Sequence, residues 1–368
     1  MVKRQMKITN VEAIPLQIPL ETPATFATRT IRFRDYVAVK IHTDEGITGI
    51  GYTWYLHSAL VINHLLKEHL IGTDPFSIEL LWNRMYHEVY RERKGAAIKA
   101  VSALDIALWD IIGKSLKQPL YRLLGGNSNK ARCYASGGYY KEGKGIPGLV
   151  KEMTGYVARG FKAVKMKVGA MPIEKDLERI KAVRKALGSE IEIMIDANNG
   201  YTVTQAIKAG RAFEKYDVAW FEEPVWPDDI KGSAEVASAL DTPVASGELE
   251  YTRYGFRDLI VNGAIDIAQP DATACGGITE WIKIAHMASA WNMPVAPHGE
   301  HEVHMHLVAA VPNGSYVEYF LREADIMKEM LLFIGAPETV DGWLEIPPRP
   351  GLGLEFDEKI LKKYRVKI

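Results

Sequence analysis

The chain has 368 residues, of which 47% are hydrophobic and 25% are charged, and its 45 Lys and Arg residues nearly balance 46 Asp and Glu residues to give a formal net charge of -1. This balance excludes the broad basic surface that binds a phosphate backbone, so no nucleic acid is expected as a partner. No apolar run approaches the roughly 20 residues of a membrane span, and residues 1–8 precede no apolar stretch typical of a secretory signal, so we expect no membrane partner and a cytoplasmic location.

The N-terminal third of the chain combines strand and helix signals. Residues 7–55 alternate apolar and polar side chains, which predicts an antiparallel sheet. Helical patterns follow, and residues 97–112 are apolar on nearly every face, so this helix is expected to lie buried between two domains. Glycines and polar residues at 125–129 indicate a domain boundary. We therefore predict an α+β capping domain over residues 1–128.

Strand and helix signals alternate through residues 129–329. The first expected strand is 131–138, and the amphipathic segment 173–187 is typical of the helices between strands. An ionisable residue stands near the end of each later strand, at intervals of 20 to 29 residues: Lys167, Asp196, Glu222, Glu248, Asp271, His298 and Glu318. This spacing predicts an α/β fold with a (β/α)8-type barrel, a modified TIM barrel, whose chemistry lies at the carboxyl ends of its strands. The irregular tail 330–368 is expected to return to the capping domain.

Three acids stand at the ends of successive predicted strands. Asp196, Glu222 and Glu248 should converge at one edge of the barrel, where three anions are costly unless a cation neutralises them. Oxygen-only ligands favour a hard divalent ion, and Mg²⁺ is the first choice. Each acid alone is more simply a helix cap or a rim charge. Because all three stand at the ends of successive strands, together they predict a magnesium site.

Two lysines share one face of a strand beside the first of these acids. Lys165 and Lys167 lie two residues apart, and we expect them to lower each other's pKa so that a neutral amine serves as a base. A pair of solvent-edge lysines is the alternative, which the apolar residues Val164 and Met166 on the other face disfavour.

An imidazole and further carboxylates complete the predicted constellation. His298 and Asp271 end neighbouring strands, so the carboxylate is expected to fix the tautomer of the ring and raise its pKa, although a hydrogen-bonded core histidine is the simpler alternative. Lys167 and His298 should flank a substrate from opposite sides of the barrel mouth. Glu318, if protonated, would donate a hydrogen bond to a substrate carboxylate.

Other chemical groups receive simpler interpretations. The run from His298 through His301 and His304 to His306 fits no common zinc spacing, so zinc is not expected there. Cys133 and Cys275 are the only cysteines and are read as small buried hydrophobic residues.

Several short motifs together resemble the enolase superfamily, in its mandelate racemase-like subgroup, over nearly the whole chain. They occur at residues 103–110, 165–167, 196–198, 222–224, 247–248, 269–271, 297–298 and 350–353. The resemblance implies a capping domain with mobile loops at 20–32 and 52–58. It also implies that Lys167 and the His298–Asp271 pair are bases on opposite faces. Further implied roles are contacts to the substrate carboxylate by Lys165 and Glu318, a contact of Asn198 to the α-hydroxyl, and a supporting position for Glu223.

The expected activity is that of a Mg²⁺-dependent acid-sugar dehydratase acting on a small-molecule substrate and giving a 2-keto-3-deoxy acid. A racemase or epimerase of a 2-hydroxy acid uses the same two bases and is the alternative, and a non-catalytic acid-sugar or metal-binding protein is a second one. Residues 266–277 contain no lysine, unlike the enolase-like and cycloisomerase-like members, which disfavours that subgroup. A homo-oligomer is expected.

Overall fold

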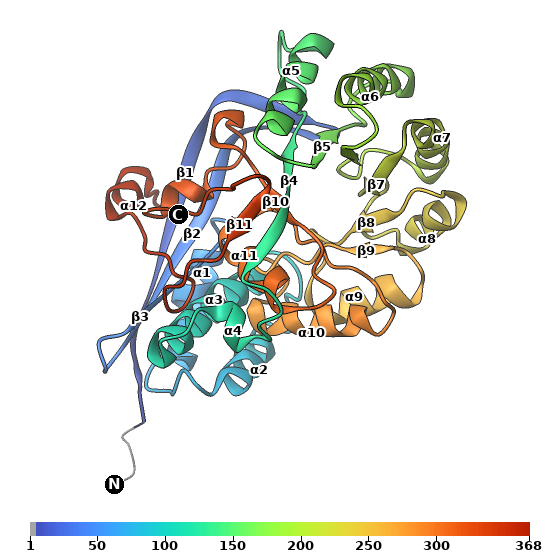
Figure 1. The fold of residues 1–368 in the computed structure, drawn as a ribbon. Coiled ribbons are helices and arrows are strands. Elements are labelled where there is room, and N and C mark those ends of the chain that lie inside the picture. The colour runs from blue at the N-terminus through green and yellow to red at the C-terminus, as the bar shows by residue number, and fades with distance from the viewer. Residues whose placement is uncertain (1–4) are drawn as a thin grey trace.

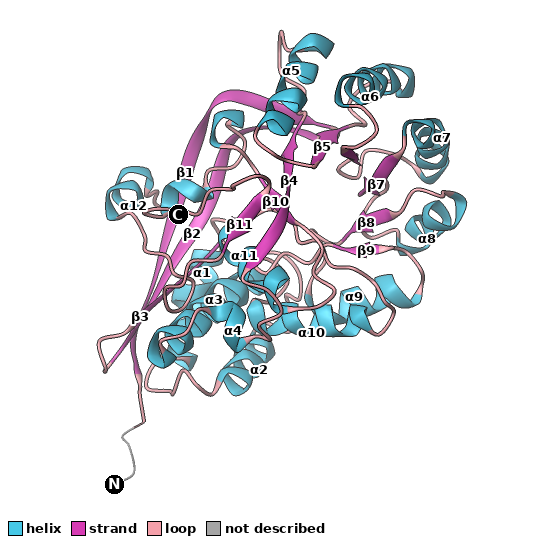
Figure 2. Cartoon of the chain, viewed as in Figure 1, coloured by secondary structure: helices cyan, strands magenta, loops and turns pink. Residues whose placement is uncertain are grey.

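The computed structural model describes residues 5–368 and begins with a long antiparallel sheet (Figures 1 and 2). Strands β1 (Ile8–Phe26), β2 (Arg29–Thr43) and β3 (Thr48–Thr53) pair in chain order. This confirms the sheet predicted for the N-terminal region, but β1 and β2 extend further than expected. A helical layer follows, with bounds α1 (Ser58–Val61), α2 (Ile78–Glu88), α3 (Ala96–Leu116) and α4 (Leu120–Leu123).

Helix α3 is buried along almost its whole length, as its apolar pattern predicted. It packs against β3 so closely that β3 needs glycine. A Cβ atom at Gly51 would lie 2.1 Å from the backbone oxygen of Ala103 and 2.8 Å from the backbone nitrogen of Ala107. The missing side chain therefore lets the sheet rest directly on the helix backbone.

Parallel strands then form the barrel, which Figure 1 shows end on. The hydrogen-bonded order is β10, β4, β5, β6, β7, β8, β9, and β11 pairs with residues 130–132 at the N-terminal end of β4. The strand bounds are β4 (Lys130–Gly137), β5 (Ala163–Lys167), β6 (Glu192–Asp196), β7 (Val218–Glu222), β8 (Val244–Ser246), β9 (Ile267–Ala268), β10 (Val317–Tyr319) and β11 (Trp343–Glu345). The helix bounds are α5 (Gly145–Ala158), α6 (Ile173–Leu187), α7 (Val203–Phe213), α8 (Ile230–Ala239), α9 (Thr252–Val261), α10 (Ile278–Ser289) and α11 (His301–Ala310). The barrel prediction is confirmed.

One predicted strand is much reduced. Residues 294–298 form no strand, and Val295 alone bridges Ala268 on one side and Gly314 on the other. Pro294 and Pro297 lack the backbone N–H groups that a full ladder requires, which explains the single bridge. The ring of strands nevertheless closes through this point.

The tip of the β1–β2 pair corrects the expectation of a loop at residues 20–32. Residues 24–26 pair with residues 29–31 in a hairpin that reaches the barrel. Its inner face packs in a cluster with Tyr139 and Phe320, which follow β4 and β10. The hairpin is held by hydrogen bonds from the Glu21 backbone N–H to Asp325 Oδ2 (2.6 Å) and from Arg34 Nε to the Ile326 carbonyl (2.7 Å).

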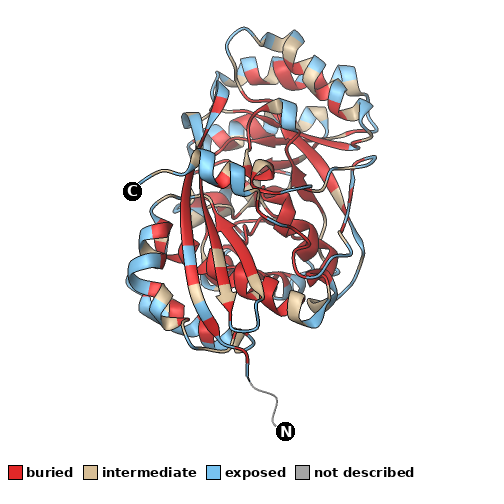
Figure 3. Cartoon of the chain, turned by 90° about the vertical axis from the view of Figure 1, so that its left-hand side faces the viewer, coloured by how far each residue is buried: buried red, intermediate tan, exposed pale blue. Residues whose placement is uncertain are grey.

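The C-terminal tail touches both parts of the molecule. Strand β11 pairs with barrel strand β4, whereas α12 (Glu358–Tyr364) lies beside β1 (Figure 1). Figure 3 shows that the strands and the layer between sheet and barrel are buried, and exposed residues are concentrated on the outer helices. The division into residues 1–128 with 330–368 and residues 129–329 stays a prediction. Within residues 5–368, no helix is both long and apolar enough to cross a membrane.

Candidate active site

The three acids predicted as metal ligands lie together at the carboxyl ends of their strands. Asp196 ends β6 and Glu222 ends β7, and the two residues are direct partners in the ladder. Glu248 follows β8 at the same edge. One ligand oxygen from each of the three acids lies within 4.8 Å of the other two. That separation is compatible with a shared Mg²⁺, whose oxygen ligands lie about 2.0–2.1 Å from the ion.

Neighbouring groups orient two of these carboxylates. Glu222 Oε2 accepts hydrogen bonds from Trp220 Nε1 (3.0 Å) and Gln269 Nε2 (2.8 Å). Asp196 Oδ1 accepts one from the backbone N–H of Asn198 (2.8 Å). Burial raises the pKa of Glu222 to about 8, which shows the cost of the anion here. The oxygen-only donor set and the cost of crowded anions both fit a hard cation.

The two lysines correct one prediction. Lys165 Nζ lies 2.5 Å from Glu222 Oε1 and 2.9 Å from Glu318 Oε1, and Lys167 Nζ forms an ion pair with Asp196 Oδ2. Burial opposes their positive charges, but the facing carboxylates outweigh it and raise the pKa of both lysines instead of lowering it. Mutual repulsion between the ammonium groups is the weaker effect in this arrangement.

His298 has the carboxylate neighbours that the sequence predicted. Its Nδ1 lies 3.3 Å from Asp271 Oδ2, and its Nε2 lies 3.6 Å from Glu248 Oε2. Burial lowers its pKa, but Glu248 and the hydrogen bond to Asp271 outweigh burial and raise the pKa to about 9. Asp271 is fixed in turn by Thr273, whose backbone N–H and hydroxyl both donate to Oδ1 at 2.7 Å.

Glu318 lies in the group but not in the expected protonation state. Burial favours its neutral form, yet Lys165, His298 and Lys167 outweigh burial and hold the pKa of this carboxyl below its usual value. Its Oε2 accepts a hydrogen bond from the Gly299 backbone N–H (2.8 Å). An ionised Glu318 accepts hydrogen bonds, so the predicted donation by a protonated acid is not supported here.

Asn198 and Glu223 lie beside the acids on strained backbone. Both have positive φ angles, 39° and 42°. The side-chain Oδ1 of Asn198 and Oε1 of Glu223 are buried without a hydrogen-bond partner among the described residues. Glu223 Oε2 accepts from Asn199 Nδ2 (2.9 Å). A buried polar atom without a partner at such a turn is typical of a position that contacts a ligand.

Two residues from the N-terminal region complete the site, and sequence reasoning did not single them out. Trp54 Nε1 donates to Asp271 Oδ2 (2.8 Å), and its ring meets that of His298 edge to face with centroids 6.3 Å apart. Lys99 Nζ lies 2.8 Å from the centroid of the Trp54 ring, and burial lowers the pKa of this lysine to about 7. No spacing in the sequence links these residues to the barrel, because the contact is purely tertiary.

Comparison with known proteins decides the family. Residues 8–125 match the N-terminal domain of the mandelate racemase / muconate lactonizing enzyme family, and residues 148–360 match the enolase C-terminal domain-like family. The chain belongs to the enolase superfamily, in its mandelate racemase-like subgroup. This confirms the resemblance drawn from the motifs.

Relatives in this subgroup are enzymes with several reactions. An arabinonate dehydratase from Saccharolobus solfataricus is 39% identical over 342 residues, which are 90% of this chain and 91% of the relative. A 3,6-anhydro-alpha-L-galactonate cycloisomerase from Streptomyces coelicolor is 34% identical over 359 residues, 95% of this chain and 97% of the relative. The crystal structure of a racemase from Streptomyces coelicolor A3(2) with bound magnesium has a TM-score of 0.92 at 33% identity, and the match covers 98% of this chain and 100% of that chain.

These relatives decide one of the alternatives drawn from the sequence. The protein is an enzyme of the mandelate racemase-like type, which sets aside a non-catalytic binding protein. A protein named as a cycloisomerase is also among the similar proteins, so similarity alone does not decide between the reactions.

Proposed function

We propose that this enzyme is a Mg²⁺-dependent hydro-lyase of sugar acids. It removes the proton α to the carboxylate and expels the β-hydroxyl to give a 2-keto-3-deoxy acid. The observation that supports the proposal is the gathering of Asp196, Glu222 and Glu248 within 4.8 Å, next to Lys165, Lys167 and the His298–Asp271 pair. The similarity to an arabinonate dehydratase favours dehydration among the reactions of the family.

In this proposal, Asp196, Glu222 and Glu248 hold the magnesium ion. When bound, Mg²⁺ supplies positive charge next to the substrate carboxylate, whose negative charge grows as the α-proton leaves. Lys165 lies on β5, and its ammonium group pairs with Glu222 and Glu318. This group can exchange these partners for the substrate carboxylate and stabilise its negative charge. Asn198 offers its unpartnered Oδ1 to the α-hydroxyl.

Proton transfer falls to Lys167 and His298. Lys167 or the His298–Asp271 pair, in its neutral form, takes the proton from the α-carbon, and the electron pair of that C–H bond forms the carbon–carbon double bond. Lys167 would reach its neutral form when a magnesium ion takes the place of its ammonium group beside Asp196. The β-hydroxyl leaves with a proton from His298 as water, and the resulting enol tautomerises to the 2-keto acid. A His298 with a raised pKa carries the proton that this step requires.

A racemase or epimerase remains the second candidate. Two proton-transfer groups, Lys167 and His298, carried on separate segments of the barrel would allow removal of the α-proton on one face and its return on the other. The similarity to a structure named as a racemase supports this alternative. The two reactions differ in whether the substrate offers a β-hydroxyl that can be expelled.

A screen of sugar acids in D₂O with Mg²⁺ tests the proposal. Aldonates, aldarates and simple 2-hydroxy acids are incubated with the enzyme and followed by proton NMR. Loss of the α-proton signal with formation of a 2-keto-3-deoxy product supports the dehydratase. Deuterium incorporation with inversion at the α-carbon supports the racemase. Absence of exchange with every acid would refute both.

A further inference from the structure

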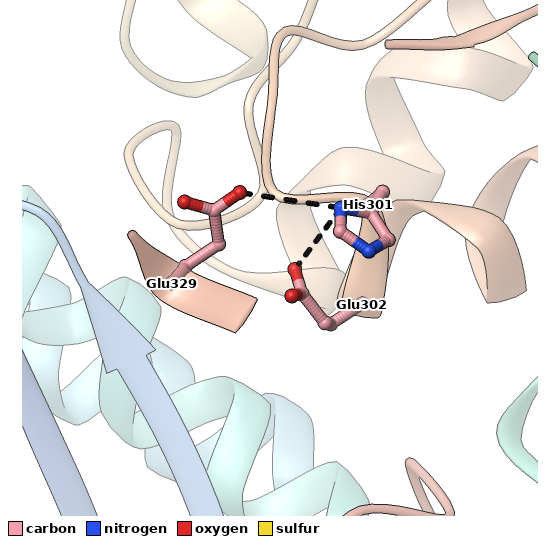
Figure 4. A group of neighbouring side chains, drawn as sticks. All are labelled: His301, Glu302 and Glu329. Carbon is pink, nitrogen blue, oxygen red and sulfur yellow. Dashed lines mark ion pairs between the residues drawn. The ribbon is translucent and has the colours of Figure 1, made fainter. Parts of the chain in front are cut away.

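A second group of metal-ligating side chains lies outside the proposed magnesium site. His301 and Glu302 begin α11, and Glu329 begins the short 3-10 helix of residues 329–332, where the barrel region ends and the tail begins. One ligand atom from each of the three lies within 4.8 Å of the other two, and their relative exposures are 1%, 0% and 0%. Figure 4 shows both carboxylates beside the imidazole ring.

The distances within this group lie at or beyond the limit of a hydrogen bond and suit an ion between the atoms. His301 Nδ1 lies 3.5 Å from Glu302 Oε2 and 4.0 Å from Glu329 Oε1. Two ligands bound to one zinc ion at about 2.0–2.1 Å in tetrahedral geometry lie about 3.4 Å apart. Small inward movements of the three side chains would therefore complete a coordination sphere.

The side chains of this group lack the partners that buried polar atoms normally have. His301 Nδ1, Glu302 Oε1 and Glu329 Oε1 have no hydrogen-bond partner among residues 5–368. Nor does any lysine or arginine in this range form an ion pair with Glu302 or Glu329. Both side-chain oxygens of the adjacent Glu300 are also buried and unpartnered. A fully buried imidazole that faces two carboxyl groups, with no lysine or arginine paired to them, points to a missing cation.

We propose that His301, Glu302 and Glu329 form a second cation site and that its preferred ion is Zn²⁺. One neutral imidazole and two carboxylates balance the charge of a divalent ion. Imidazole nitrogen favours zinc over magnesium, in contrast to the oxygen-only site of Asp196, Glu222 and Glu248.

The other histidines of the same helix are committed elsewhere. His304 Nδ1 lies 2.7 Å from the Gly299 carbonyl, and its Nε2 accepts a hydrogen bond from the Ala272 backbone N–H (2.9 Å). His306 Nε2 lies 3.1 Å from the Leu352 carbonyl. The proposed ligands therefore are one histidine of the run, the adjacent Glu302, and Glu329 from a separate segment.

The site would tie three parts of the chain together. Tyr36 on β2 donates to Glu329 Oε2 (3.0 Å), and Tyr52 on β3 lies 3.4 Å from Glu302 Oε2 and donates to it. An ion held by α11 and the 3-10 helix of residues 329–332 would therefore also fix the carboxylates that accept hydrogen bonds from the N-terminal sheet. Its expected role is to stabilise the closed arrangement of sheet, barrel and tail, without contact to the reacting atoms.

Metal analysis of the full chain tests the proposal. The protein is expressed in zinc-supplemented medium and equilibrated with excess Mg²⁺, and bound zinc is counted by mass spectrometry after gel filtration. We expect one zinc per chain in the wild type and in Asp196→Asn, which lacks a ligand of the proposed magnesium site. We expect Glu329→Gln to lose this zinc. The control is Glu323→Gln, which changes an exposed acid of the neighbouring segment and should retain the zinc.

Two further results are independent of whether a variant folds. X-ray absorption at the zinc edge of the wild type should show one imidazole nitrogen among oxygen ligands, and loading with zinc should raise its melting temperature. Oxygen-only coordination, or zinc that is lost in Asp196→Asn but kept in a folded Glu329→Gln, would overturn the proposal. A wild-type chain that binds no zinc under these conditions would overturn it as well.

Discussion

Replacing Asp271 by asparagine is expected to lower the pKa of His298 in the metal-free enzyme. The pKa rises from 6.5 to about 9 in the folded chain, although burial acts in the opposite direction. This rise corresponds to about 3 kcal/mol in favour of the protonated ring. Asp271 Oδ2 lies 3.3 Å from Nδ1. Two unit charges at that distance attract by about 5 kcal/mol at an effective dielectric constant of about 20, before the desolvation cost is subtracted.

Loss of the Asp271 charge should therefore lower the pKa of His298 by at least about one unit. The asparagine oxygen can take the Oδ1 position and keep both bonds from Thr273, but its NH2 group then faces Trp54 Nε1 and His298 Nδ1, so only a variant shown to be folded tests the argument. Since the folded pKa is raised, the stabilisation by protonated His298 is complete below pH 6.5 and is lost as pH rises through about 9. The variant should lose less stability over that interval.

Labelled imidazole NMR measures this titration directly, and thermal unfolding at several pH values gives the stability. Asp258→Asn, an acid paired with Arg257 on the outside of α9, is the control and should leave both curves unchanged. An unaltered His298 pKa in a folded Asp271→Asn enzyme would refute the electrostatic argument. It would also remove the basis for treating the two residues as a catalytic pair.

Three other changes test the site and the fold. Lys167→Ala should slow proton exchange at one face of the substrate by about 10²–10⁴-fold, and unchanged exchange would exclude Lys167 as a base. Its Mg²⁺ affinity, measured by calorimetry, should be kept or increased, because the ammonium group that pairs with Asp196 is gone. Asp196→Asn should weaken Mg²⁺ binding at least about 10-fold in the same titration, and normal affinity would contradict its role as a ligand. Gly51→Ala should destabilise the protein by about 1–3 kcal/mol in chemical denaturation, because its Cβ would lie 2.1 Å from the Ala103 oxygen, whereas Gly155→Ala, with open space around it, should not.

The placement of the acids was predictable because parallel strands bring their carboxyl ends to one edge. Asp196 and Glu222 pair directly in the ladder, and Glu248 follows the next strand, so sequence spacing alone was sufficient to group them. The same reasoning placed His298 beside Asp271. In each case, the position of a residue along a strand determined where its side chain would be.

Sequence patterns predicted less wherever contacts join distant segments or charges compete. The raised pKa of Lys167 depends on its ion pair with Asp196, which outweighs the repulsion from Lys165. Trp54 reaches Asp271 across the interface between sheet and barrel. Glu329 lies far along the chain from His301, and no spacing motif joins them. Such contacts depend on how whole layers pack, which local periodicity does not encode.

The hairpin of β1 and β2 brings the N-terminal segment to the reacting end of the barrel. The ring of Phe26 lies 5.9 Å from Lys167 Nζ, and a Cβ added at Gly200 would lie 2.5 Å from that of Ala27 at the turn. In the proposed site, this hairpin would form a wall beside the substrate, and it is encoded apart from the groups that move protons. Substitutions in the hairpin would then change which molecules are accepted while the proton-transfer groups stay in place.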